Sequence, residues 1–444
     1  SFGETADTYY LAIGRPQAFA DNQAFNDGTD ASPPTPVDSV GSVEYYAYDD
    51  FLSAKKITSS DVSLVIPRRN WTTGTVYDYY RHDYGDINSA GSVISSDSGA
   101  TSLYDATFYV MNSTFDVYKV IDNNSGGAST VEPSGNKSTS VFSTGDSYKW
   151  KYMYSLSASE QANFLSTDFM HVSTESSDFS TTGGAIEHVK ITAGGSSGSN
   201  ATYSNVAIRG DGSSGECTIV VSGGAVSSVT ITTAGSGYTF ASLKASEIGN
   251  VSGADIDFII SPPGGHAADV VTELGGFFVM TNVDLTQADG SGDFSTGNDF
   301  RRIALLRNPT DSTTGSTASA TTLDATKSIT FSGTPGSFQA DEKITQATTG
   351  AVGFVVDFNS TTKVLRYVQP QFADQGVDSD GNLTAFASTH TVTGATSSAT
   401  GTPSSHDTTP ELTHDTGDIL YIENRKPISR AADQTENVKL IVEF

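Results

Sequence analysis

Three short segments of the chain contain residue types that proteins often use to recognise one another. Arg68-Arg69-Asn70-Trp71 places two guanidinium groups beside a large aromatic ring, and arginine and tryptophan are enriched at the centres of protein interfaces. Arg301-Arg302 and Asn424-Arg425-Lys426-Pro427 supply further basic side chains. We therefore predict candidate interface residues in all three segments, namely Arg68, Arg69, Trp71, Arg301, Arg302, Asn424 and Arg425.

Each segment also has an intramolecular alternative that the sequence leaves open. In the first, the arginines could bind nearby carboxylates while the tryptophan fills the core. In the second, Asp299 could pair with the arginines that follow it. In the third, a turn between strands could let Arg425 reach a partner or bridge to Asp433.

The sequence carries no strong signature of an enzyme or a metal site. Asp378-Ser379-Asp380-Gly381-Asn382 begins like a calcium loop, but its glycine is one position early and Thr389 stands where a bidentate glutamate is needed. A hairpin turn explains this segment better. The adjacent Asp49 and Asp50 should point in different directions, which does not suit glycosidase chemistry. We predict no catalytic residues, no cofactor and no metal.

Cysteine and histidine usage agrees with this prediction. Cys217 is the single cysteine, so neither an internal disulfide nor a multi-cysteine metal site can form. We expect Cys217 to be a small buried residue. The seven histidines lack metal-ligand spacing, and we expect His406 and His414 to be solvated in a polar stretch.

The chain is strongly acidic, with 24 basic and 51 acidic residues and a formal net charge of −27. This charge repels phosphate backbones and anionic membrane surfaces, so we predict neither nucleic-acid binding nor membrane insertion. Solubility is the simpler explanation of the acidity, and selection of basic partner surfaces is the alternative. No apolar run approaches the ~18 residues of a membrane span, and the start lacks a signal-peptide pattern.

Glycine, serine and threonine punctuate short apolar and aromatic runs, which is typical of sheets joined by many turns. Residues 148–154 alternate aromatic and other side chains and predict a strand. Ser157 and Glu160 fit a capping box that starts a helix reaching about Leu165. A second, weaker helix is predicted at residues 50–57.

Two further strands are predicted near the C-terminal end of the sequence. Residues 417–428 open as a strand, which we expect the charges and the proline of residues 424–427 to break. Residues 438–444 alternate with a two-residue period, so we expect a strand with one buried face, paired into a sheet.

The length of 444 residues exceeds the ~250–300 of a usual single core, so two or more domains are expected. Residues 223–232 repeat the pattern of residues 183–192, in which a turn is followed by an alternating strand. This repeat predicts a Gly-rich β-repeat module over 183–263. We expect its repeats to pair with each other or to dock on the main body. Strand-like stretches flanked by low-complexity linkers at 311–317 and 394–400 predict a second β-module over 311–409. Residues 1–182, 264–310 and 410–444 would then form one body.

Several blocks, in the same order along the chain, resemble the baseplate wedge proteins of T-even-like contractile-tailed phages. The blocks are Tyr10 to Pro16, Pro33 to Val40, Val65 to Trp71, Gly145 to Tyr154, Phe300 to Pro309, and the C-terminal stretch from Gly417 to Phe444. The two predicted modules lie between these blocks and do not belong to the pattern.

The resemblance implies the dimeric component of a baseplate wedge, with a layered β-sandwich body and a few short α-helices. Such a protein would join other wedge proteins around a central hub, rearrange when the tail contracts, and reside in the virion after assembly in the host cytoplasm. The alternative is a tail-associated adhesin or carbohydrate-binding protein, in which Tyr238 and Tyr367 of the two modules would meet glycans. A tail-associated hydrolase is the third hypothesis.

Overall fold

The computed structural model describes residues 7–19, 28–36, 47–88, 91–174, 179–285, 296–370, 376–380, 382–430 and 436–443. In it, 45% of the residues lie in strands and 6% in helices, which confirms the mainly β fold. The chain forms two compact units. Unit 1 contains Ser1–Val62 and Thr281–Leu440, and unit 2 contains Ser63–Met280 and Ile441–Phe444.

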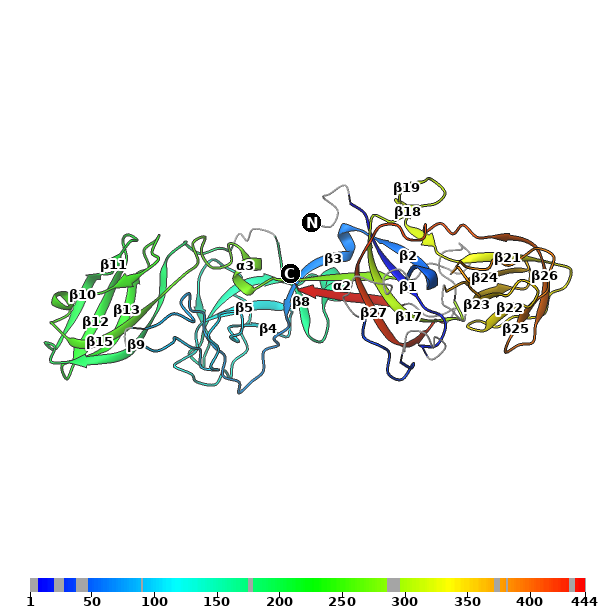
Figure 1. The fold of residues 1–444 in the computed structure, drawn as a ribbon. Helices are drawn as coiled ribbons and strands as arrows, with labels where there is room; N and C mark the ends of the chain where they lie inside the picture. Colours follow the sequence, from blue (N-terminus) through cyan, green and yellow to red (C-terminus); the bar gives the residue numbers. More distant parts are fainter. Residues whose placement is uncertain are drawn as a thin grey trace. The chain divides into compact units, whose positions relative to one another are not determined.

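Unit 1 is built on a five-stranded antiparallel sheet that joins distant parts of the chain (Figure 1). Its central strand presents Leu11 and Ile13 to one apolar cluster and Tyr10 and Ala12 to another, so both faces of the sheet are buried. In spatial order the strands are β20 (Thr322–Asp324), β2 (Phe51–Ile57), β1 (Tyr9–Gly14), β17 (Asp299–Arg307) and β27 (Asp418–Ser429).

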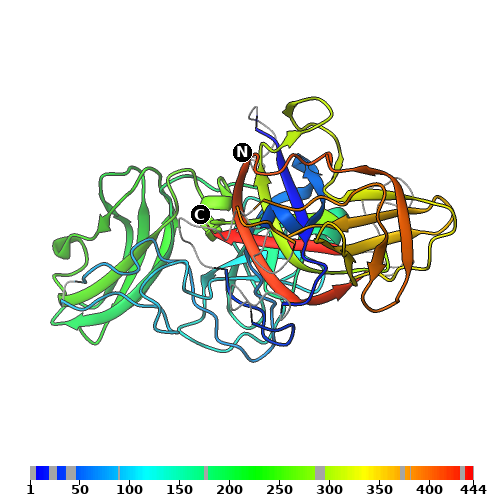
Figure 2. The same ribbon diagram turned by 45° about the vertical axis from the view of Figure 1, so that its right-hand side comes forward.

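The second part of unit 1 is a closed barrel, drawn in yellow to brown in Figures 1 and 2. Its interior is filled by apolar side chains such as Ile329, Ile344, Leu365 and Tyr367. Several of its strands fall in the strand-like stretches that were predicted within residues 311–409. In barrel order the strands are β21 (Lys327–Ser332), β24 (Val364–Val368), β23 (Ala351–Asn359), β22 (Lys343–Gln346), β25 (Val392–Gly394) and β26 (Thr400–Asp407).

Unit 2 contains a four-stranded sheet whose aromatic side chains, such as Tyr118 and Trp150, belong to a large core cluster. Strand β7 confirms the aromatic strand predicted at 148–154, and helix α2 confirms the predicted capping box, because Ser157 accepts the Glu160 N–H and Glu160 reaches back. The elements are β4 (Tyr109–Met111), β5 (Asp116–Asp122), β7 (Lys149–Ser155), β6 (Phe142–Ser143), the pair β3 (Val62–Pro67) and β8 (Phe169–His171), and the helices α2 (Ala158–Phe164) and α3 (Val270–Leu274).

The Gly-rich part of unit 2 has its own apolar core, which includes Ile186 from the first repeat and Val226 from the second. The two repeats therefore contribute strands to the same core. The Ile186 N–H donates to the Ala234 carbonyl at 2.9 Å. The strands are β9 (Ile186–Ser196) paired with β15 (Ser252–Ile260), β10 (Ala201–Ala207), β12 (Glu216–Ser222) and β13 (Ala225–Thr233) in one sheet, and β11 (Arg209–Gly210) paired with β14 (Ala241–Ser242).

The remaining elements are short or lie at the boundary of the units. Strands β16 (Phe278–Asp284) and β28 (Asn437–Glu443) are hydrogen-bonded neighbours, and each contains residues of both units. Strand β28 includes the stretch predicted from residue 438, whereas Phe444 lies outside the described residues. A small hairpin joins β18 (Thr310–Asp311) to β19 (Ser316–Thr317), and among the described residues short 3-10 helices cover Tyr48–Asp50, Ser59–Asp61 and Ala245–Glu247. None of the described helices has the length and apolar character needed to span a bilayer.

The structure corrects three local predictions. Residues 51–57 form strand β2 instead of a helix, because they pair with β1 on one side and β20 on the other. Residues 424–427 do not break the strand. They form a bulge within β27, where Pro427 is tolerated because β27 is an edge strand. The predicted linker at 394–400 is a turn between β25 and β26, so it is part of the barrel and does not flank it.

Candidate functional site

Arg302 is the best-defined of the predicted interface residues. Its Nη1 lies 2.6 Å from Asp50 Oδ1, and its Nε donates to Asn424 Oδ1 at 3.2 Å. Asp50 is fully buried, and it also receives a hydrogen bond from Gln17 Nε2 at 3.2 Å and an ion pair from Arg15 at 3.9 Å. Burial raises the pKa of Asp50, while Arg302 and Arg15 oppose this shift. The side chains therefore form a buried charge network inside unit 1.

Arg301 is held in a neighbouring network. Its Nε and Nη2 each lie 2.9 Å from an oxygen of Asp30, and its Nη2 lies 3.3 Å from Asp299 Oδ2. Burial favours the neutral acid, but the hydrogen bonds from Arg301 and from the Phe19 N–H hold the pKa of Asp30 below its usual value. The pairing of Arg301 with Asp299, one of the sequence alternatives, is present. These contacts give Arg301 a role within the protomer.

Asn424 and Arg425 lie next to each other on β27 but have different surroundings. Asn424 Nδ2 donates to the Pro34 carbonyl at 3.1 Å. The Arg425 side chain is 50% exposed and pairs with Glu423 at 3.0 Å. Asp433, its predicted partner, lies outside the described residues.

Arg68 and Arg69 form hydrogen bonds to loops of unit 2. Arg68 Nη1 donates to the Ser166 carbonyl at 2.7 Å. Arg69 Nη2 donates to the Tyr104 carbonyl at 3.1 Å, and its guanidinium carbon lies 4.6 Å from the centre of the Tyr109 ring. Both side chains remain partly exposed. Their partners are backbone carbonyls, the Tyr109 ring and, for Arg68 Nε, the Asn70 side-chain oxygen at 3.0 Å, in place of the carboxylates considered from the sequence.

Trp71 is partly buried and packs against the aromatic core of unit 2. Its Nε1 donates to Ser129 Oγ at 3.0 Å. The indole thus has a structural role, and it lies close in sequence to two partly exposed arginines. The candidate residues consequently fall in two groups, with Arg68, Arg69 and Trp71 in unit 2 and the others in unit 1.

Comparison with protein families gives a match to the model named Bacteriophage T4, Gp8 over residues 1–125. The match supports the prediction of a T4-like baseplate wedge protein. The segment matched to Gp8 contains β1 to β5, and therefore supplies the central strand of the unit 1 sheet and part of the unit 2 sheet. No curated protein matches the chain.

The Gp8-matched segment also contains Asp49 and Asp50, whose side chains diverge as predicted. Asp50 meets Arg302, whereas Asp49 Oδ1 lies 2.7 Å from His414 Nε2. His414 is 40% exposed, which agrees with the expectation that it is solvated. Its imidazole also pairs with Asp49 and with Asp415, which raise its pKa against the effect of burial. His406 is exposed, as expected.

Other predicted features can be located as well. Cys217 is fully buried, and burial raises the pKa of its thiol to about 11. Asp378 accepts the N–H groups of Asp380 and Asn382 at 2.9 Å, as in a turn, while Gly381 lies outside the described residues. Within the described parts of the chain, no three His, Cys, Asp or Glu side chains are grouped so that they could hold a metal ion.

Tyr238 and Tyr367, the aromatic residues considered for glycan binding, are both buried. Tyr238 is 3% exposed and Tyr367 is 0% exposed. Tyr238 is instead an internal brace, because its hydroxyl donates to the Ile208 carbonyl and accepts the Gly215 N–H, each at 3.1 Å. Neither ring can stack on a sugar in this conformation.

Sequence analysis missed a buried group of charges in unit 2. Lys119 on β5 and Lys151 on β7 are both 0% exposed. Lys151 Nζ donates to the carbonyls of Tyr152 at 2.7 Å and Ser138 at 3.1 Å, and burial lowers its pKa to about 8. Lys119 pairs with Glu273 of α3. The signal in the sequence that could have indicated this group is Lys119 itself, which stands between Tyr118 and Val120 in β5.

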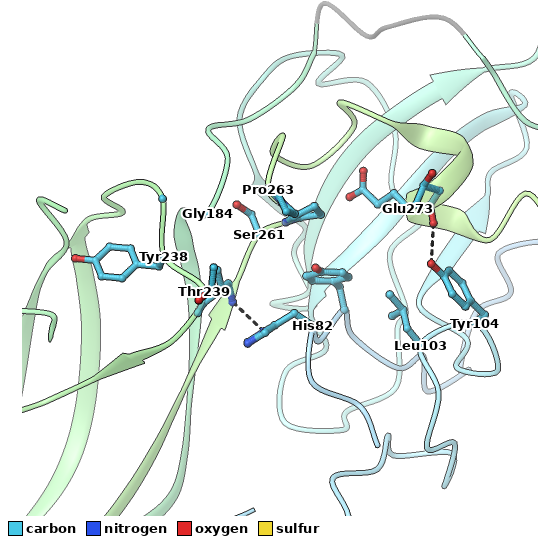
Figure 3. A pocket seen from close by; sticks show the side chains of 14 residues that line it. His82, Leu103, Tyr104, Gly184, Tyr238, Thr239, Ser261, Pro263 and Glu273 are labelled. Atoms are coloured by element: carbon cyan, nitrogen blue, oxygen red, sulfur yellow. Dashed lines mark hydrogen bonds between the residues drawn. The ribbon is translucent and has the colours of Figure 1, made fainter. Parts of the chain in front are cut away.

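A cavity of about 470 Å³ adjoins this group (Figure 3). Glu273 and Tyr80 line it, together with His82, Tyr104 and Tyr238. Two hydrogen bonds hold its wall: the Tyr104 hydroxyl donates to the Thr272 carbonyl at 2.9 Å, and the Ile260 N–H donates to His82 Nδ1 at 3.3 Å. The cavity therefore lies against Glu273, the partner of Lys119.

Proposed function

We propose that this chain is a structural, non-enzymatic component of a phage tail baseplate wedge, which forms a homodimer and assembles with other wedge proteins around the central hub. The observation that carries the proposal is the Gp8 match over residues 1–125. The same segment supplies β1, β2 and Asp50, around which the unit 1 sheet and its buried charges are organised. The chain would be assembled in the host cytoplasm and reside in the virion.

The buried arginine networks support the proposal that unit 1 is rigid. A buried ion pair is costly to break because either partner alone would be an uncompensated charge. Arg301, Arg302 and Asp50 therefore favour one arrangement of their strands. We propose that contraction moves each unit as a rigid body and that polar contacts with neighbouring wedge proteins exchange.

Partner contacts are proposed at the arginines that keep exposed surface. Arg68, Arg69 and Arg425 each retain solvent exposure while being positioned by a neighbouring group. Trp71 and Asn424 would keep structural roles within the protomer beside these arginines. The net charge of −27 would favour partner surfaces that are basic overall.

We further propose that residues 183–263 and 311–409 are β-modules inserted into a body made of residues 1–182, 264–310 and 410–444. The separate core of the Gly-rich strands and the closed barrel support this division. Insertion at a surface loop costs little when the ends of the loop are already close together.

Electron cryomicroscopy of the intact phage before and after tail contraction tests this function. We expect the chain in the wedges in both states, with each unit superimposing on itself. Absence of the chain from the baseplate would overturn the assignment. Internal refolding of either unit would overturn the rigid-body mechanism.

A further inference from the structure

Lys119 and Glu273 form an ion pair in the interior of unit 2. Their side chains are 0% and 4% exposed, and Lys119 Nζ lies 4.1 Å above the centre of the Tyr80 ring. Within the described residues Nζ makes no hydrogen bond of normal geometry. A lysine ammonium carries three N–H groups, so burying it with a single carboxylate contact is unfavourable.

The Glu273 carboxyl is held in one orientation. The Ala267 N–H donates to Oε2 at 2.7 Å, and His266 Nδ1 lies 3.0 Å from Oε1. The other ring nitrogen of His266 lies 3.7 Å from Glu187 Oε2. A backbone donor and an imidazole therefore contact the carboxyl that meets Lys119, and a second acid lies near the other nitrogen of that imidazole.

The environment also favours an uncharged amine. Burial lowers the pKa of Lys119 well below its usual range, the Glu187 carboxylate opposes this shift, and the Lys151 ammonium adds to it. Burial likewise lowers the pKa of His266 and raises that of Glu187. A desolvated, neutral lysine is a nucleophile.

We propose that Lys119 and Glu273 condense to an intramolecular amide, an isopeptide bond between β5 and α3. The inference goes beyond the proposed function, since it concerns a covalent modification of the chain itself. No activating group or oxidant is needed, because the reaction converts an amine and a carboxylic acid to an amide and water.

The condensation starts from the ion pair. Proton transfer within the ion pair gives a neutral amine and a carboxylic acid. Lys119 Nζ attacks Glu273 Cδ, and the charge that develops on Oε2 is stabilised by the Ala267 N–H. The Cδ–Oε1 bond then breaks. Oε1 leaves as water with its own proton and one from Nζ, which His266 can relay, and the second Nζ proton remains on the amide.

Burial of the two charged groups would favour the amide, and the cavity would receive the released water. The amide replaces two ionisable groups that are costly to keep charged in the interior. The released water can pass into the cavity that Glu273 and Tyr80 line (Figure 3). Fixed geometry places the two groups in contact throughout, which is the condition under which intramolecular reactions are fastest.

The bond would close a loop that contains the whole of residues 120–272, including the Gly-rich strands. Tension applied to the chain outside this loop would then pass through the isopeptide bond and bypass the loop. The bond would also restrict the unfolded chain, as a disulfide does.

The mass of the denatured full-length protein tests the proposal. We expect a mass lower than that of the sequence by one water molecule, and a branched tryptic peptide that joins Lys119 to Glu273. A full-sequence mass, with Lys119 free to react with an amine reagent in denaturant, would overturn the proposal and leave a buried ion pair.

Two variants make the assignment specific. Lys119→Met should restore the full mass, whereas Lys151→Met should still lack one water, since Lys151 is equally buried but is bonded only to carbonyls. Water loss that persists in Lys119→Met would overturn the assignment. Because the wild-type measurement requires no substitution, a variant that does not fold leaves the test intact.

Discussion

Arg302 Nη1 lies 2.6 Å from Asp50 Oδ1, in a site where the Asp50 side chain is 0% exposed. Asp50 belongs to the segment that matches Gp8, whereas Arg302 lies outside it on β17. The pair therefore joins the matched segment to a distant part of unit 1. Arg302 was predicted as a candidate interface residue, but its ion pair with Asp50 lies inside its own protomer.

Replacing Arg302 by methionine should destabilise unit 1 strongly. The substitution leaves Asp50 buried without its closest cation, and removing one partner of a buried pair costs roughly 3–5 kcal/mol. We expect a clear fall in the temperature at which unit 1 unfolds, measured by calorimetry. Arg425→Met is the matched control, because that side chain is half exposed and its pair with Glu423 should contribute less than about 1 kcal/mol. Equal effects of the two substitutions would contradict the structural role of Arg302.

Asp341 should make the stability of unit 1 depend on pH. Burial, together with the nearby Asp299 carboxylate, raises the pKa of Asp341 from 3.8 to about 7, against a hydrogen bond from the Asp299 N–H. A raised folded-state pKa means that the folded protein binds more protons, so this contribution is present at low pH and is lost as the pH rises through about 7.

Asp341→Asn isolates this effect. Asparagine can still accept the Asp299 N–H, and it tolerates the positive φ of 63° at this position. We expect the variant to have a higher melting temperature than the wild type at about pH 8, and the difference to shrink toward about pH 5. A difference that does not change with pH would show that Asp341 is not the titrating group.

Charge reversal at Arg425 tests the proposed partner surface. Arg425→Glu should weaken association with other wedge proteins while leaving the melting temperature nearly unchanged, because the side chain is half exposed. Arg209→Glu is the matched control, since Arg209 is 53% exposed and also pairs with a glutamate, Glu247, in the Gly-rich strands. Titration calorimetry with each partner compares them. If Arg425→Glu binds as tightly as the wild type, the contact at Arg425 is excluded.

Local patterns predicted the elements whose own residues determine their structure. The aromatic alternation of β7 and the capping box of α2 are set by neighbours within a few residues, and both are confirmed. Residues 51–57 were wrongly predicted as helical because their pairing with β1 and β20 depends on distant strands. The strand break at Pro427 was wrongly predicted for a similar reason, since only the order of the strands in the sheet shows that β27 is an edge strand.

The candidate site was less accessible from the sequence. Arginines were identified by type, but their burial depends on Asp30 and Asp50, which lie more than half the chain away. The pair Lys119 and Glu273 has the same difficulty, because no short-range motif connects β5 with α3. Charges that meet across such separations are specified by the fold.

Light scattering of the purified protein tests whether the chain is a wedge component. The mass should be measured alone and after mixing with the other wedge proteins of the same phage. We expect a dimer that joins a discrete larger complex. A monomer or trimer that remains separate from every wedge partner would contradict it.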